Sequence, residues 1–169
     1  KGLKLANPET LTNSAIKNLT IESSRKKKIK YLSMLREQKR RRGKNHLIPF
    51  TQYTNPIYRP ARHHHLIAEK LEKVEAGLCD RLMIFMPPRH GKSELASRRF
   101  PAWYLGRNPM KQIIASSYST DLAEEFGRNV RDIVRDSTFT DVFDGISLSP
   151  DAKAIGRWNT NTGGIYKAA

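Results

Sequence analysis

Apolar residues recur at helical intervals in two stretches of the chain. One stretch covers residues 63–76, and the other follows the polar residues 119–121. In both, an apolar side chain returns every three or four positions, which gathers these side chains on one face of a helix. The positions are Ile67, Leu71, Val74 and Leu78 in the first stretch and Leu122, Phe126, Val130 and Val134 in the second. Both stretches are therefore predicted to be helices with one buried face.

Short apolar runs between these helices predict buried strands. Residues 81–86 read RLMIFM, and residues 111–118 read KQIIASSY. An apolar run of this length is typical of a strand that is covered on both faces, as in parallel sheets. A further helix is predicted between the two runs, from Lys92 to about Leu105, with a bend near Pro101.

The end of the chain carries a hairpin signal. Residues 154–160 and 164–169 have strand character, and the turn residues Asn161 to Gly163 lie between them. Taken in order, the predicted elements are helix, strand, loop, helix, strand, helix and hairpin. Strands that alternate with helices predict an α/β fold built on a parallel sheet.

The first part of the chain has weaker patterns. Residues 1–24 carry no strong period and are predicted to be mostly unordered. Residues 23–44 are predicted to form a charged helix with a thin apolar stripe at every third position over residues 29–35. Residues 50–65 are predicted to be an irregular connection, because their prolines interrupt any continuous helix.

The formal net charge of the chain is +15, and this charge is unevenly distributed. Residues 1–50 hold fourteen Lys and Arg against three Glu, whereas residues 51–169 hold seventeen against thirteen acidic residues. A surplus of this size indicates a polyanionic partner, most simply nucleic acid. The alternative of equal weight is that the basic run is a solvated helix face or a loose tail.

Other features argue against some classes of protein. Cys79 is the only cysteine, so no intrachain disulfide is possible, and a reducing compartment fits. No apolar run approaches the roughly 20 residues that span a bilayer, and no membrane partner is expected. The run Arg62 to His65 holds three consecutive histidines, which cannot all face one ion from a helix. A metal site there is not favoured, because no Cys or carboxylate has ligand spacing nearby.

The stretch FMPPRHGKSE, residues 85–94, ends like a phosphate-binding loop. Met86 stands where the pattern G-x-x-x-x-G-K-[ST] has its first glycine, and a stiff Pro-Pro pair follows it. Such a loop needs inward N–H groups, a helix N-terminus behind them, a cation and a hydroxyl group. Gly91 permits the close approach of the backbone to the phosphate, Lys92 is the cation, and Ser93 is the candidate metal ligand.

The segment MPPRHGKSE resembles the deviant Walker A motif of the large terminase subunits of tailed bacteriophages. The segments YRPARHHHLIAEKLEKVEAG before it and QIIASSYSTDLAEEFGRNVRDIV and RWNTNTGGIYKAA after it follow the order of that family. The resemblance covers roughly Phe50 to Ala169. It implies a partial P-loop ATPase domain over residues 46–169, with residues 1–45 as a basic extension that is helical or partly disordered. In the intact family proteins the ATPase drives viral DNA into a preformed capsid, and a C-terminal domain is a nuclease.

The resemblance implies ATP and Mg²⁺ as cofactors. It assigns Lys92 to the β- and γ-phosphates, Ser93 to Mg²⁺ and Arg89 to a catalytic role at the γ-phosphate. The other nucleotide contacts it implies are Pro88, His90, Gly91 and Glu94 in the loop, with Tyr58 and His64 as adenine candidates upstream. The implied partners are double-stranded DNA, the portal protein, the small terminase subunit and further copies in a ring. The implied location is the cytoplasm of an infected or lysogenic bacterial host.

The acidic Walker B strand of the family is not found before Ala169. Asp141 and Asp144 lie in FTDVFDG, which is a poor strand. We therefore expect a truncated piece with at most weak nucleotide binding and negligible hydrolysis, because without the acidic residues there is no second anchor for Mg²⁺ and no group to orient the attacking water. Two alternatives remain open. One is a catalytically inactive remnant that binds nucleic acid, and the other is a different P-loop NTPase such as a helicase, which fits the loop but not its flanks.

Overall fold

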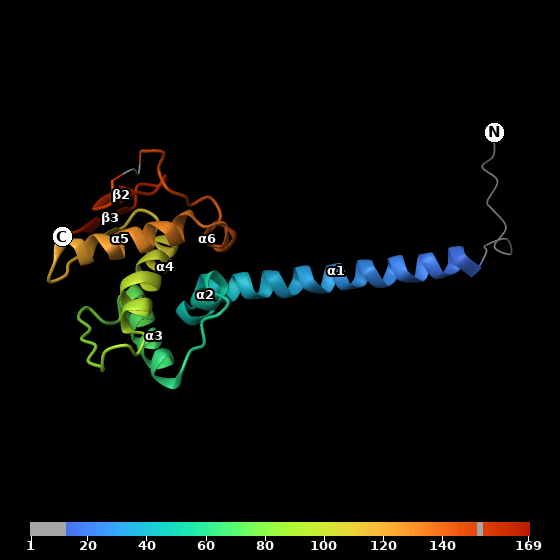
Figure 1. Cartoon of the computed structure of the whole chain (residues 1–169), viewed down its shortest axis with the longest axis horizontal. Helices are drawn as coiled ribbons and strands as arrows, with labels where there is room; N and C mark the ends of the chain where they lie inside the picture. The colour runs from blue at the N-terminus through green and yellow to red at the C-terminus, as the bar shows by residue number, and fades with distance from the viewer. Residues whose placement is uncertain (1–12, 152–153) are drawn as a thin grey trace. The chain divides into compact units, whose positions relative to one another are not determined.

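The computed structural model describes residues 13–151 and 154–169, and the side chains from residue 25 onward within these ranges. The chain divides into two compact units between Gln38 and Lys39, inside the first helix. The elements follow one another in the order shown in Figure 1. They are α1 (Asn13–Asn45), α2 (Leu47–Thr54), α3 (Arg62–Glu75), the π-helical turn η2 (Glu94–Arg99), α4 (Phe100–Arg107), β1 (Gln112–Ala115), α5 (Thr120–Arg135), α6 (Ser137–Val142), β2 (Arg157–Asn159) and β3 (Ile165–Ala168). The predicted α/β class is confirmed.

The sheet is small and mixed. Its order is β1-β3-β2, with β1 parallel to β3 and β2 antiparallel to β3. The predicted hairpin is confirmed, and Gly163 at φ +94 makes the turn that reverses the chain. The predicted parallel sheet is confirmed only for β1 and β3, because the short turn between β2 and β3 forces those two strands to run in opposite directions.

The strand predicted over residues 81–86 does not form. This segment has no regular secondary structure, although its side chains alternate as they would in an extended chain. Ile84 packs against the core, whereas Met83 and Phe85 are 81% and 87% exposed. Within the described residues β1 pairs with β3 alone, so the apolar run has no partner strand and only one of its faces is covered.

The N-terminal helix is longer than predicted. It begins at Asn13, so the expectation of an unordered segment is wrong for residues 13–24, and its remainder falls outside the described residues. None of the side chains from Arg25 to Arg42 is buried, and the thin stripe includes Ile29 at 59% and Leu32 at 52% exposure. No helix in the described ranges is both long and apolar enough to cross a membrane.

A second correction concerns α2, which occupies part of the predicted irregular connection. Pro49 fits because it is the third helical residue, where the backbone N–H has no helical acceptor in any case. The hydroxyl group of Thr51 donates to the carbonyl of Leu47 at 2.8 Å, so a buried polar side chain is satisfied inside the helix. The N–H group of Leu47 is capped by Glu72 of α3 at 2.7 Å.

The helix predicted from Lys92 forms the centre of unit 2. Helical hydrogen bonding runs from Lys92 to Arg107, and the wider turn η2 ends directly before the Phe100-Pro101 pair. Pro101 cannot donate to Ser97, which explains why the regular helix is interrupted near the predicted position. Trp103 is 1% exposed, and its indole N–H donates to the carbonyl of Gly43 at 3.1 Å.

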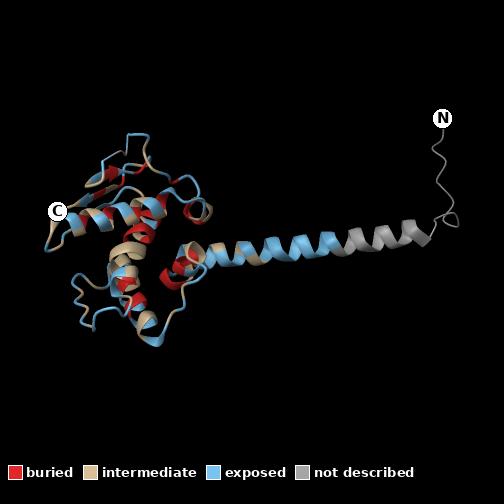
Figure 2. Ribbon diagram, viewed as in Figure 1, coloured by how far each residue is buried: buried red, intermediate tan, exposed pale blue. Residues whose placement is uncertain are grey.

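Burial is concentrated where α2, α4 and α6 meet and where α5 lies on the sheet (Figure 2). Phe50, Phe139 and Phe143 form an aromatic cluster with ring centroids 5.2–6.2 Å apart. On the sheet, Trp158 stacks on Tyr166 at 5.1 Å, and its indole N–H donates to Gly127 of α5 at 3.1 Å. These contacts fix the sheet against α5.

The buried phenol of Tyr166 predicts a loss of stability at high pH. Its hydroxyl group has no hydrogen-bond partner within the described structure, and burial raises its pKa to about 12. The folded state therefore disfavours the phenolate, and the associated stability is present below pH 10 and is lost as the pH rises towards 12. In denaturant titrations, Tyr166→Phe should reduce the loss between pH 9 and pH 11 by about 1 kcal/mol. Tyr118→Phe, at a residue that is 93% exposed, should leave the profile unchanged. Equal profiles for all three proteins would contradict this prediction.

Candidate functional site

The residues of the predicted loop enclose one hollow. Nine consecutive residues, Met86 to Glu94, line a cavity of about 400 Å³. The first helical hydrogen bond behind it runs from the N–H group of Leu95 to the carbonyl of Gly91 at 3.2 Å. The N–H groups of residues 92–94 precede this bond and so lack intrahelical acceptors. Free donors and the positive end of a helix at one hollow favour an anion.

Two left-handed residues shape the turn. Arg89 has φ 62 and Gly91 has φ 80, both in the region that residues with a side chain avoid. The ring nitrogen Nδ1 of His90 lies 2.7 Å from the carbonyl oxygen of Pro88, which closes the turn around Arg89. A strained non-glycine residue at the mouth of a hollow is a typical feature of functional sites.

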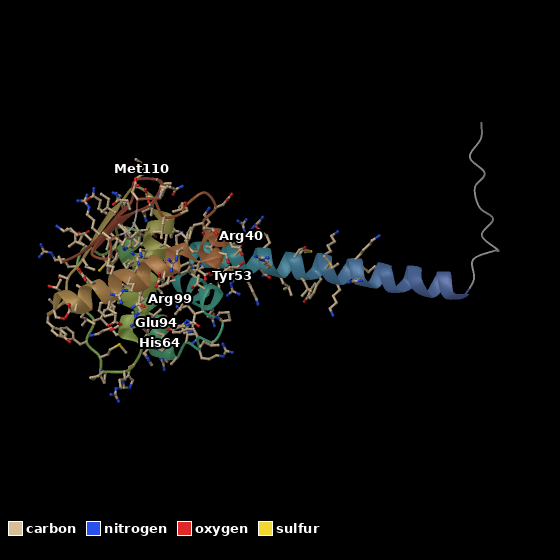
Figure 3. The ribbon with its side chains drawn as sticks, turned by 45° about the horizontal axis from the view of Figure 1, so that its top comes forward. Arg40, Tyr53, His64, Glu94, Arg99 and Met110 are labelled. Atoms are coloured by element: carbon tan, nitrogen blue, oxygen red, sulfur yellow. The ribbon has the colours of Figure 1, made fainter. Side chains whose placement is uncertain are left out.

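The charged residues of the loop divide into two groups. Arg89 and Lys92 are exposed, line the hollow and have no ion-pair partner within the described part of the chain. Glu94 is held by Arg99 at 2.8 Å, and both residues are labelled in Figure 3. Arg98 lies 3.4 Å from the same carboxylate, so the charge of Glu94 is largely compensated. The hollow therefore has a positive balance that a polyanion can use.

All seven loop residues predicted to contact a nucleotide line the same hollow. They are Pro88, Arg89, His90, Gly91, Lys92, Ser93 and Glu94. The hydroxyl-bearing residue Ser93 is exposed beside Lys92, as a metal ligand would need to be. Their roles toward a nucleotide and Mg²⁺ remain predictions.

The two adenine candidates lie together outside this lining. The rings of Tyr58 and His64 are 5.6 Å apart. The hydroxyl group of Tyr58 is buried without a partner in the described structure, and burial together with the charge of Glu94 raises its pKa to about 12. His64 has Nε2 3.0 Å from the carbonyl oxygen of His90. Contact of either residue with adenine remains a prediction.

His63 is a loop contact that the sequence reasoning did not identify. Its Nε2 atom lies 3.2 Å from the carbonyl oxygen of His90 and 3.0 Å from Nε2 of His64. The signal was present in the sequence, because both histidines fall in the first turn of the predicted helix upstream of the loop. No group of three or more His, Cys, Asp or Glu residues in the described ranges is arranged to hold a metal ion.

A substitution at Gly91 tests whether His64 crowds the turn. A Cβ atom there would lie 2.5 Å from Nε2 of His64, whereas one at Gly77, with φ 71, would meet nothing within 4 Å. Gly77→Ala should cost about 1–2 kcal/mol in unfolding free energy from the left-handed backbone alone. Gly91→Ala should cost at least about 1 kcal/mol more, because the side chain of His64 must also move. Equal losses in denaturant unfolding would show that the histidine does not restrict this position.

Comparisons with known proteins relate part of the chain to a protein family. The family model described as "Terminase large subunit, T4likevirus-type, N-terminal" matches residues 83–166. No curated protein and no solved structure gives a significant match. The matched range contains the loop, the helix that follows it and nearly all of the three-stranded sheet. Residues 83–166 of this chain are therefore similar to the N-terminal regions of terminase large subunits, and this match supports the resemblance predicted from the sequence.

Proposed function

We propose that the loop Met86–Glu94 binds ATP with Mg²⁺ and that the chain supplies this nucleotide site to a phage terminase. The observation that carries the proposal is that Lys92 and the neighbouring residues of the first helical turn line one hollow of about 400 Å³. The family match supports a role in DNA packaging. The positive balance of the hollow supports a phosphate-bearing ligand.

Each loop residue has a chemical part in this proposal. The ammonium group of Lys92 neutralises the β- and γ-phosphates, and the hydroxyl group of Ser93 is a ligand for Mg²⁺. The N–H groups of the first helical turn donate to phosphate oxygens without side-chain rearrangement. The guanidinium group of Arg89 stabilises the charge that spreads over the γ-phosphate oxygens in the transition state.

The finer fold and partner assignments belong to the same proposal. The extended segment 81–86, which leads directly into the turn, corresponds to the strand that precedes the loop in P-loop proteins. We propose that this segment forms the backbone hydrogen bonds of a β-strand when a further strand pairs with it. The proposed partners are double-stranded DNA, the portal protein, the small terminase subunit and other copies in a ring, in the cytoplasm of the bacterial host.

Nucleotide affinity of a lysine variant tests the proposal. Lys92→Ala should weaken binding of Mg·ATP by about tenfold to a hundredfold, the loss of one charge-assisted hydrogen bond, measured by isothermal titration calorimetry. Lys111→Ala removes an exposed lysine outside the hollow and should bind like wild type. If wild type and Lys92→Ala bind Mg·ATP equally, or if neither binds, the nucleotide proposal fails.

A second candidate function is sequence-independent binding of nucleic acid by the basic helix. Residues 25–44 hold eleven Lys and Arg against the single acid Glu37. From Arg25 to Gln38 this part of α1 has no buried side chain, so its positive charge is exposed on all sides of the helix. Such a helix can neutralise backbone phosphates without reading bases.

Salt dependence distinguishes this function from a merely solvated helix. Replacing Lys27, Lys28 and Lys30 by Gln should reduce the slope of log K against log[salt] for duplex DNA by up to about 2–3, because up to three phosphate contacts are lost. A control set of the same size, Lys70, Lys111 and Lys167 to Gln, has the same change in charge outside α1. Equal slopes for the two triple variants would exclude α1 as the binding surface.

A further inference from the structure

We propose that His64, assisted by His63, is a positioning residue that holds the loop backbone in the orientation an anion requires. The proposal rests on the proposed nucleotide function and assigns to α3 a part in it. Three observations carry it: the anchoring of His64, the convergence of two imidazoles on one carbonyl group, and the geometry of the peptide that follows.

The ring of His64 is fixed by its place in α3. His64 is the third residue of this helix, and its backbone N–H group donates to the carbonyl of Ala61 at 3.0 Å. In return, the N–H group of Ala61 donates to Nδ1 of His64 at 2.9 Å. The helix itself is held in the core by buried Ile67 and Leu71. The histidine is therefore a side-chain cap on a rigid element rather than a mobile surface group.

This cap determines which ring nitrogen carries the proton. Since Nδ1 of His64 accepts a hydrogen bond, the neutral ring must carry its proton on Nε2. Nε2 then donates to the carbonyl oxygen of His90, 3.0 Å away. Nε2 of His63 lies 3.2 Å from the same oxygen. Two rings from one turn of α3 thus converge on one carbonyl group of the loop, 26 residues away for His64.

The same protonation argues against metal binding by the two rings. Their Nε2 atoms are 3.0 Å apart, close enough to suggest a shared ion. A metal ligand would need a free lone pair on Nε2 of His64, which would move the proton to Nδ1 and break the cap on Ala61. Both nitrogens of His64 are thus engaged within the protein, and only the face of its ring is left to contact a base.

The consequence for the loop follows from peptide geometry. In a trans peptide the C=O and N–H groups lie in one plane and point in opposite directions. No cis peptide occurs in the described residues, so a His90 carbonyl that points toward the histidines makes the Gly91 N–H group point away from them. Neither His63 nor His64 lines the hollow, whereas His90 and Gly91 both do.

A flipped peptide would reverse the electrostatics of the site. If the bond from His64 were absent, the peptide between His90 and Gly91 could rotate and present a carbonyl oxygen to the hollow. A carbonyl dipole there would repel a phosphate, whereas an N–H group attracts it. The left-handed conformation of Gly91 and the close approach of His64 to this residue both accompany the observed orientation of the peptide.

Matched substitutions at His64 test this role. His64→Gln keeps a donor for the His90 carbonyl and a group suited to cap Ala61, since Gln is favoured at this helix position. His64→Met has a similar volume and no N–H donor. His65→Met changes the neighbouring exposed histidine, which has no bond to the loop in the described structure. Thermal unfolding of each variant establishes that it is folded before its affinity for Mg·ATP is measured near pH 8.

The expected order of affinity separates positioning from stability. His64→Met should bind Mg·ATP about tenfold more weakly than wild type, His64→Gln should stay within about threefold, and His65→Met should match wild type. The inference is overturned if His64→Met binds like wild type while Lys92→Ala loses affinity, because the nucleotide site would then be real and independent of the histidine. If wild type itself binds no Mg·ATP, the proposed nucleotide function has failed.

A spectroscopic measurement decides the geometry whether or not nucleotide binds. Long-range ¹H–¹⁵N spectra of the imidazole rings identify which nitrogen carries the proton. We expect His64 to be in the Nε2–H form, with its Nε2–H proton protected from exchange by the bond to His90. A His64 ring in the Nδ1–H form, or one whose proton exchanges as fast as that of His65, would contradict the inference.

Discussion

The helix that begins at Lys92 has to be buried along its middle while its first turn stays open. Leu95, Ala102 and Leu105 are completely buried, and η2 contacts α2, α3 and α5. Removing this helix from the core would therefore expose the faces of three others. The open first turn is rigid for the same reason, because the residues immediately after it are fixed by packing. The loop for which we propose anion binding is therefore held in place by this hydrophobic anchor.

Charge compensation behind the loop follows from the same packing. Glu94 would oppose an anion if its charge were free, but Arg99 and Arg98 hold it on the side of α2 and α5. Arg99 also donates to the hydroxyl group of Thr54 at 2.8 Å, which links the end of α2 to the start of the helix. Arg98 and Arg99 thus neutralise Glu94, and Arg89 and Lys92 remain to line the hollow.

The basic segment and the loop represent two different uses of positive charge. In α1 the positive charge is spread along a helix with no buried side chain from Arg25 to Arg42. This arrangement suits a long polyanion, and such binding weakens as the salt concentration rises. At the loop a few charges and dipoles converge on one hollow, which suits a compact anion. The two proposed functions, binding of DNA and binding of a nucleotide, would therefore rest on separate physical mechanisms.

The sequence alone determined the elements whose signals are local. Apolar spacing located α3 and α5, and Gly-Lys-Ser located the hollow. The side chain of Ser119, in the polar residues before α5, accepts a hydrogen bond from the N–H group of Leu122 and so caps this helix. Local patterns suffice for such features because helix periodicity, caps and left-handed glycines depend on neighbours in the chain.

Tertiary structure decided what depends on distant partners. The run 81–86 looks like a buried strand, but no strand in the described residues pairs with it. Residues 50–54 are helical because Glu72 caps α2 and the core buries Phe50. The contact of His63 and His64 with the His90 carbonyl joins segments more than twenty residues apart, and no spacing rule encodes it. Strand pairing, long-range caps and the direction of a peptide plane are fixed only when the chain has folded, because their energies depend on groups that the sequence does not place together.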